Sequence, residues 1–137
     1  MPDVYHHAHT VAADEIDRYG HANNLRYMHW ILAAAAAHSS AQGWSHEDYV
    51  RIGAAWFVRS HRIKYLNAAL EGEAVIVKTW VASMERFSSV RKYRVVRAAD
   101  DVTLAAAETQ WVFVDLTTRA LRPIPDEVAA AFTVVVK

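Results

Sequence analysis

The pattern of hydrophobic and polar positions changes once along the chain, from a helical repeat to a series of strands. Apolar residues recur at the spacing of one helix face after residue 24, at Leu25, Met28, Ile31, Leu32 and Ala35. Asn23 or Asn24 is a suitable N-cap, and Gly43 is placed to end the helix after about residue 42. The alanine run at residues 33–37 keeps part of this helix small, so we expect other elements to lie close against it.

The rest of the chain predicts β-strands. A short strand-compatible segment at residues 4–13 precedes the helix, and four longer segments rich in aromatic and β-branched residues follow it, at 54–66, 73–83, 88–98 and 102–115. Polar turns are expected around 45–48, 68–72 and 99–101, and a short helix at 126–132. This order predicts a single α+β domain over residues 1–137, in which a curled antiparallel β-sheet wraps a long central helix.

Composition narrows the class of protein. Apolar residues make up 53% of the 137 residues and charged residues 22%, as is usual for a folded water-soluble domain. Fifteen Lys and Arg balance fifteen Asp and Glu, so no net field favours nucleic acid. The chain has no cysteine, which excludes thiolate chemistry, and its apolar runs are too short to span a bilayer. We therefore expect a cytoplasmic protein that binds neither nucleic acid nor membrane.

The predicted sheet has long edge strands, and one helix cannot cover the whole of a wide apolar sheet. Pairing of two copies through an edge strand would satisfy the unpaired backbone groups. Two-fold pairs are also the commonest assemblies of soluble proteins. The sequence therefore predicts a homodimer, which can pair further into a homotetramer.

The segment at residues 15–30 carries the candidate chemistry. It places Asp17, Gly20, His21 and two asparagines in a loop that runs directly into the helix. A helix N-terminus presents unpaired N–H groups and a partial positive charge, so it can stabilise an anionic oxygen. A carboxylate beside such a site suits hydrolysis of an activated acyl group. A plain helix cap is the structural alternative for Asp17.

This loop resembles that of the hotdog-fold thioesterases, in particular the 4-hydroxybenzoyl-CoA thioesterase and acyl-ACP thioesterase branches. Their shared pattern is an Asp, two residues, a small residue or Gly, then His-x-Asn-Asn and an aromatic helix start, which residues 17–27 match. Residues 59–66, 71–80 and 111–125 resemble later strands and turns of the family in the same order. One position departs: Tyr19 stands where the acyl-ACP branch carries asparagine.

The resemblance implies a catalytic site in this loop, and we expect neither a cofactor nor a metal. It implies catalytic roles for Asp17 and His21. Asn24 is a further catalytic candidate, and Gly20, Asn23, Tyr27 and His61 are candidates for substrate binding. Asp17 would attack the thioester carbon or act as general base on a water. Backbone N–H groups near the two asparagines would polarise the thioester carbonyl. A histidine satisfied within the sheet is the alternative for His61.

Three functions follow as alternatives. The leading prediction is an acyl-CoA thioesterase; the others are an acyl-ACP thioesterase and a hotdog protein that binds acyl-CoA without hydrolysing it. A basic face near the pocket would favour the acyl carrier protein, because that partner is acidic. Seven basic residues on the strands are candidates for gripping phosphates or, equally, for a solvated face: Arg59, Arg62, Lys64, Arg86, Arg91, Lys92 and Arg94. The tryptophans are expected in the core, with some of them lining an acyl pocket.

Overall fold

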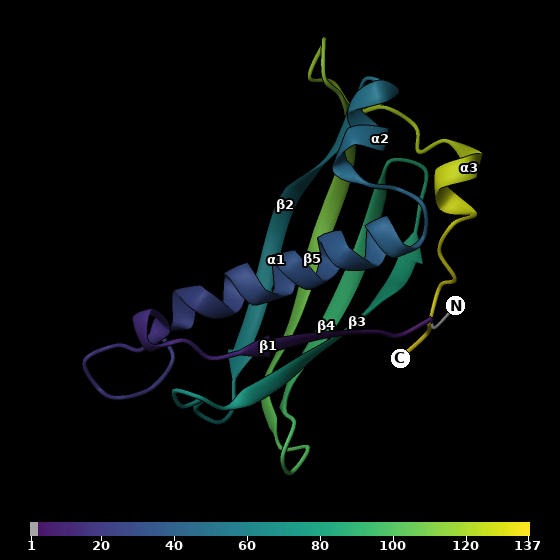
Figure 1. The fold of residues 1–137 in the computed structure, drawn as a ribbon. Helices are drawn as coiled ribbons and strands as arrows, with labels where there is room; N and C mark the ends of the chain where they lie inside the picture. The colour runs from purple at the N-terminus through teal and green to yellow at the C-terminus, as the bar shows by residue number, and fades with distance from the viewer. Residues whose placement is uncertain (1–2) are drawn as a thin grey trace.

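The computed structural model describes residues 3–137 and confirms the predicted α+β order (Figure 1). A 3-10 turn at Ala13–Glu15 separates the first strand from the long helix. The remaining elements, in chain order, are β1 (Tyr5–Thr10), α1 (Asn24–Ala41), α2 (His46–Arg51), β2 (Ala54–Tyr65), β3 (Ala74–Met84), β4 (Ser88–Arg97), β5 (Thr103–Asp115) and α3 (Asp126–Ala129).

The five strands form one antiparallel sheet in the order β1-β3-β4-β5-β2, which curls around α1 (Figure 1). The face of α1 toward the sheet repeats at helical spacing and buries Tyr27, Trp30, Ile31, Ala34, Ala35 and His38. These side chains pack against alternate residues of the strands, such as Val75, Val77 and Val95. Burial of this apolar surface is the main force that holds the helix in the sheet.

Two local expectations from the sequence were wrong. Where a polar turn was expected around residues 45–48, residues 46–51 form the helix α2, which begins at a capping box between Ser45 and Asp48. Leu25, expected on the buried face of α1, is 72% exposed. It lies in the first turn, where the helix projects beyond the sheet (Figure 1).

The strand β2 lies at one edge of the sheet and carries exposed apolar side chains. Phe57, Val58 and Tyr65 on this strand are each 40–42% exposed, and Leu66, just after it, is 48% exposed. An edge strand also leaves a row of backbone groups without a partner strand. Edge and apolar surface thus coincide along β2.

Candidate functional site

The loop that carries Asp17 is closed by its own backbone. Ile16 and Ala22 form an antiparallel bridge, and the Asp17 N–H donates to the His21 carbonyl (2.9 Å). The Gly20 N–H donates to the Asp17 carbonyl (3.1 Å), with Gly20 at φ +85°, where a residue with a Cβ is strained. The Asp17 carboxylate accepts one hydrogen bond, from the Tyr19 N–H (2.8 Å). The loop therefore holds a half-buried carboxylate, one oxygen of which accepts no hydrogen bond within residues 3–137.

The start of α1 leaves one backbone donor available beside this loop. The Asn23 N–H donates to the Glu15 carbonyl (2.8 Å), and the Asn23 side chain caps the helix by accepting from the Leu25 N–H (2.9 Å). Asn24, the first helical residue, is exposed, and its N–H donates to no residue within 3–137. Of the two amides that the sequence singled out, Asn24 supplies the free donor.

A buried carboxylate that the sequence did not single out supports the loop. Glu15 is 8% exposed and accepts from His9 Nε2 (2.7 Å), Trp30 Nε1 (2.8 Å) and the Ala12 N–H (2.9 Å). Burial alone would raise the pKa of Glu15, but these hydrogen bonds outweigh it and the pKa is lowered. Glu15 thus ties β1 and α1 together two residues before Asp17. In the sequence, Glu15 is distinguished only by its position two residues before the motif at residues 17–27.

The other predicted site residues differ in their surroundings. The His21 side chain is exposed in the loop itself. Tyr27 is 2% exposed and packs against Trp30 and Tyr65, so it belongs to the core. The Tyr65 hydroxyl donates to the Asn24 carbonyl (3.1 Å), which joins the end of β2 to the start of α1.

His61 lies four residues before Tyr65 on β2 and contacts the sheet rather than the loop. Its Nδ1 is 2.8 Å from the Thr109 hydroxyl, and burial lowers the pKa of His61. Thr109 on β5 is in register with His61 on β2 and with Arg91 on β4. The three residues therefore form a row across the helix-facing side of the sheet.

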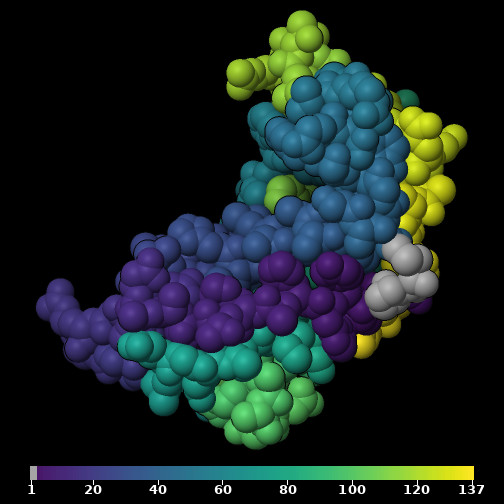
Figure 2. All heavy atoms as spheres, in the orientation of Figure 1, coloured from purple at the N-terminus to yellow at the C-terminus, as the bar shows by residue number. Residues whose placement is uncertain are grey.

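A cavity of about 910 Å³ opens between the C-terminal half of α1, the helix α2 and the sheet. Figure 2 shows the surface hollowed between the two helices. Aromatic side chains dominate the lining: Trp44, Tyr49, Trp56, Phe57, Trp111 and Phe132. The alanine run contributes Ala35 and Ala36, whose small side chains leave the space open. The cavity has the size and apolar character of a small-molecule site.

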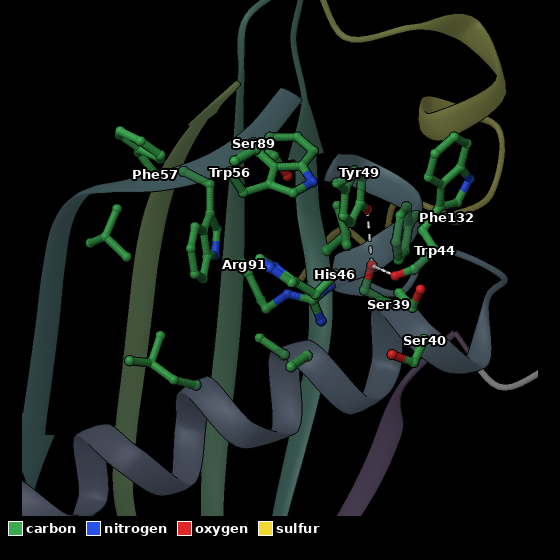
Figure 3. Close-up of a pocket in the computed structure, with 18 of the residues that line it drawn as sticks. Ser39, Ser40, Trp44, His46, Tyr49, Trp56, Phe57, Ser89, Arg91 and Phe132 are labelled. Carbon is green, nitrogen blue, oxygen red and sulfur yellow. Dashed lines mark hydrogen bonds between the residues drawn. The ribbon is translucent and has the colours of Figure 1, made fainter. Parts of the chain in front are cut away.

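Arg91, on β4, is a buried charged residue in the cavity wall (Figure 3), and Glu47 on α2 is an exposed one. Its Nη1 donates to His38 Nδ1 (2.8 Å) and to the Thr79 hydroxyl (3.1 Å), and its guanidinium lies over the Phe132 ring. Burial, and secondly the charge of Arg91, lower the pKa of His38 to about 4. Arg91 is 6% exposed, so it does not belong to a solvated face.

The other basic strand residues gather on the opposite side of the sheet. Arg62, Lys64, Lys92 and Arg94 surround a shallow hollow there, together with Glu108 and Lys137. They occupy the positions that alternate with the helix-facing residues, such as Arg91 and Tyr93 on β4. A basic face therefore exists, but it is separated from the cavity by the thickness of the sheet.

Within the part of the chain that the structure describes, no group of three or more His, Asp or Glu residues has metal-site geometry. His9 Nε2 on β1 lies 2.7 Å from a carboxylate oxygen of Glu15. The helices in residues 3–137 include none that is long and apolar enough to cross a membrane.

The sequence matches one protein family along nearly all of its length. Residues 2–132 match the acyl-ACP thioesterase N-terminal domain. The chain belongs to this family. The resemblance carried by residues 17–27 is thereby confirmed, as is the assignment to a family of thioester hydrolases. No curated protein matches the sequence.

Solved structures of thioesterases share the fold of this family member. A protein assigned as an oleoyl thioesterase from Lactobacillus plantarum superposes with a TM-score of 0.90 at 24% identity, over 98% of this chain and 53% of that one. The 1,4-dihydroxy-2-naphthoyl-CoA thioesterase from Synechocystis gives 0.87 at 19% identity, over 93% and 94%. An acyl-ACP thioesterase from Bacteroides thetaiotaomicron gives 0.81 at 20% identity, over 90% and 49%. The chain thus spans about half the length of the first and third.

Proposed function

We propose that this protein hydrolyses the thioester of acyl-CoA to a free acid and CoA. The observation that carries the proposal is a half-buried Asp17 carboxylate in a loop closed by the Ile16–Ala22 bridge, followed two residues after that bridge by the free Asn24 N–H at the start of an 18-residue helix. A thioester carbonyl that accepts from this N–H gains support where negative charge develops in the tetrahedral intermediate. The partial positive charge of the helix terminus adds to that support.

Asp17 acts either on the thioester carbon, as nucleophile, or on a water, as general base. In the first case the carboxylate displaces the CoA thiolate, and water then hydrolyses the resulting mixed anhydride to the free acid. In the second case the activated water attacks the carbonyl carbon and the CoA thiolate leaves. Gly20 gives the loop its turn, and Asn23 holds the helix start in place. His21, exposed in the same loop, would orient the water or donate to the carbonyl oxygen.

We infer that two copies assemble through β2. Within one chain the α1 residues that line the cavity begin at Leu32, about 12 Å along the helix axis from Asn24. The cavity also uses residues 55–58, the first half of β2, whereas Tyr65 at its other end contacts the start of α1. Antiparallel pairing of β2 with its copy would place the Asp17 loop of one protomer beside the cavity of the other.

The acyl-ACP substrate is the principal alternative. The family to which the chain belongs supports it, and so does the basic face formed by residues such as Arg62 and Arg94. Against it, this face and the cavity lie on opposite sides of the sheet. A protein that binds acyl-CoA without hydrolysis is the third possibility, which the free Asp17 carboxylate disfavours.

Thiol release from a panel of acyl-CoAs, followed with a thiol-reactive dye, tests the proposal. The absence of cysteine removes background from the protein. Asp17→Asn keeps the acceptor for the Tyr19 N–H and removes the base, so we expect kcat to fall at least about 100-fold. Asp14→Asn, which removes an exposed carboxylate three residues away, is the matched control and should leave kcat unchanged.

Each outcome of the panel has a clear meaning. Turnover that is unaffected by Asp17→Asn would refute the assigned role of Asp17. Absence of turnover on every acyl-CoA, together with turnover of the same acyl groups on acyl carrier protein, would establish the alternative substrate. Tight stoichiometric binding of intact acyl-CoA would support the non-hydrolysing protein.

A further inference from the structure

Arg91 is a buried cation without an acidic partner. It is 6% exposed, and no Asp or Glu forms an ion pair with it within residues 3–137. Burial lowers its pKa, but a guanidinium remains charged at neutral pH. A buried charge costs several kcal/mol unless an opposite charge or a full set of hydrogen bonds compensates it.

The protein supplies only part of that compensation. Nη1 makes both hydrogen bonds, donating to two neutral acceptors, His38 Nδ1 and the Thr79 hydroxyl. The Nε and Nη2 atoms donate to no acceptor within the described residues, and Arg91 lines the cavity. One edge of the guanidinium therefore remains available for a ligand.

Among the residues that the structure describes, no carboxylate of the cavity wall pairs with Arg91. The carboxylate among the lining residues is that of Glu47, which lies on α2 and is exposed. Most of the remaining wall is aromatic or aliphatic. The cavity thus suits an apolar molecule that carries an anionic oxygen group.

We propose that the cavity binds acyl groups that end in a carboxylate, with Arg91 as the residue that recognises that carboxylate. This inference rests on the proposed function, because it names the substrate class of the same site. Arg91 lies at the buried side of the cavity, whereas Phe57 and Val58 at its β2 side are 40% exposed. The acyl chain then runs inward from a thioester at β2 to the guanidinium.

The surroundings of Arg91 hold its plane in place for such a ligand. The Phe132 ring lies under the guanidinium at 5.9 Å, and His38, fixed between Tyr5 and Phe132, accepts from one corner. A guanidinium held in this way can present its second edge to a carboxylate through two parallel hydrogen bonds. A free lysine would not provide this geometry.

Binding of non-hydrolysable amides tests the inference without requiring turnover. The probes are N-methyl amides of alkanoic acids and of the α,ω-diacids of equal chain length, from six to ten carbons, titrated at neutral pH by tryptophan fluorescence and calorimetry. We expect the carboxylate-ended amide to bind about 10-fold to 100-fold more tightly than its neutral counterpart at the preferred length. Arg91→Gln should abolish that difference while leaving the affinity of the neutral amide within about twofold.

Arg94→Gln is the matched control, since it removes the same charge from the same strand on the opposite face of the sheet. It should preserve the preference. Equal affinity of the two amides for the wild-type protein at every length would overturn the inference, even if Arg91→Gln failed to fold. Thiol release from acyl-CoA in the same preparations reports separately on the proposed hydrolysis. Carboxylate-selective binding without turnover would therefore refute the enzyme and retain the site.

Discussion

Acidification should destabilise the fold through His38. This side chain is 2% exposed, stacks on Tyr5 and meets the edge of the Phe132 ring. Arg91 Nη1 donates to its Nδ1, and because arginine has no acceptor, the imidazole must be neutral with its proton on Nε2. Protonation would remove that acceptor and place two cations side by side in the core.

The magnitude follows from the pKa of His38. Burial and the neighbouring charge lower it from 6.5 to about 4. Between these values the unfolded chain binds a proton that the folded protein does not, so the free energy of unfolding falls as the pH falls. For these two pKa values, His38 contributes a loss of about 2 kcal/mol between pH 7.5 and pH 5. The loss is complete only below pH 4.

Urea unfolding across this pH range measures the effect. His38→Gln keeps a carbonyl that can accept from Arg91 and removes the titration, so its stability should fall less between pH 7.5 and pH 5, by about 2 kcal/mol. The exposed His29 on the same helix provides the control, and His29→Gln should retain the wild-type pH profile. Parallel profiles for wild type and His38→Gln would refute the assignment of a neutral, low-pKa imidazole beside Arg91.

Two further predictions concern the support of the Asp17 loop. Asn23→Ala removes the cap on the Leu25 N–H and should lower the free energy of unfolding by about 1 kcal/mol, as measured in urea; an unchanged midpoint would show that the cap is dispensable. Trp30→Phe leaves one Glu15 oxygen without its buried donor and should cost about 1–3 kcal/mol. The indole N–H of Trp80 has no hydrogen-bond partner among residues 3–137, so Trp80→Phe is the control and should cost less in the same assay.

The regular elements could be predicted because their patterns extend over many residues. α1 combines a helical repeat with Asn23 before it and Gly43 after it, and the observed helix ends within one residue of the expected bound. α2 was missed because six residues are too few for a hydrophobic repeat. Its signal was local: Ser45 followed three residues later by Asp48 forms a capping box.

The Asp17 loop could be predicted from the sequence, whereas the surroundings of Arg91 in the cavity could not. Asp17 to Asn24 form a contiguous motif, so the sequence alone brings these residues together. The environment of Arg91 depends on strand register. A shift of β4 by one residue would turn Arg91 to the exposed face of the sheet and Arg94 to the face toward α1. Its partners His38 and Thr79 come from α1 and β3, at separations of 53 and 12 residues. No local pattern could identify this group of residues.

The composition of α1 connects the two halves of the proposed site. Its first turn carries the free Asn24 N–H beside the Asp17 loop, and its second half contains the alanines that leave room for the cavity. Within one chain the nearest cavity-lining residue of α1, Leu32, lies about 12 Å along the helix axis from Asn24, and the inferred pairing through β2 offers a second route between the two halves. A two-fold axis across β2 would reverse the second helix relative to the first. Each carboxylate would then act on an acyl group held by the other protomer, and the exposed apolar edge would be covered at the same time.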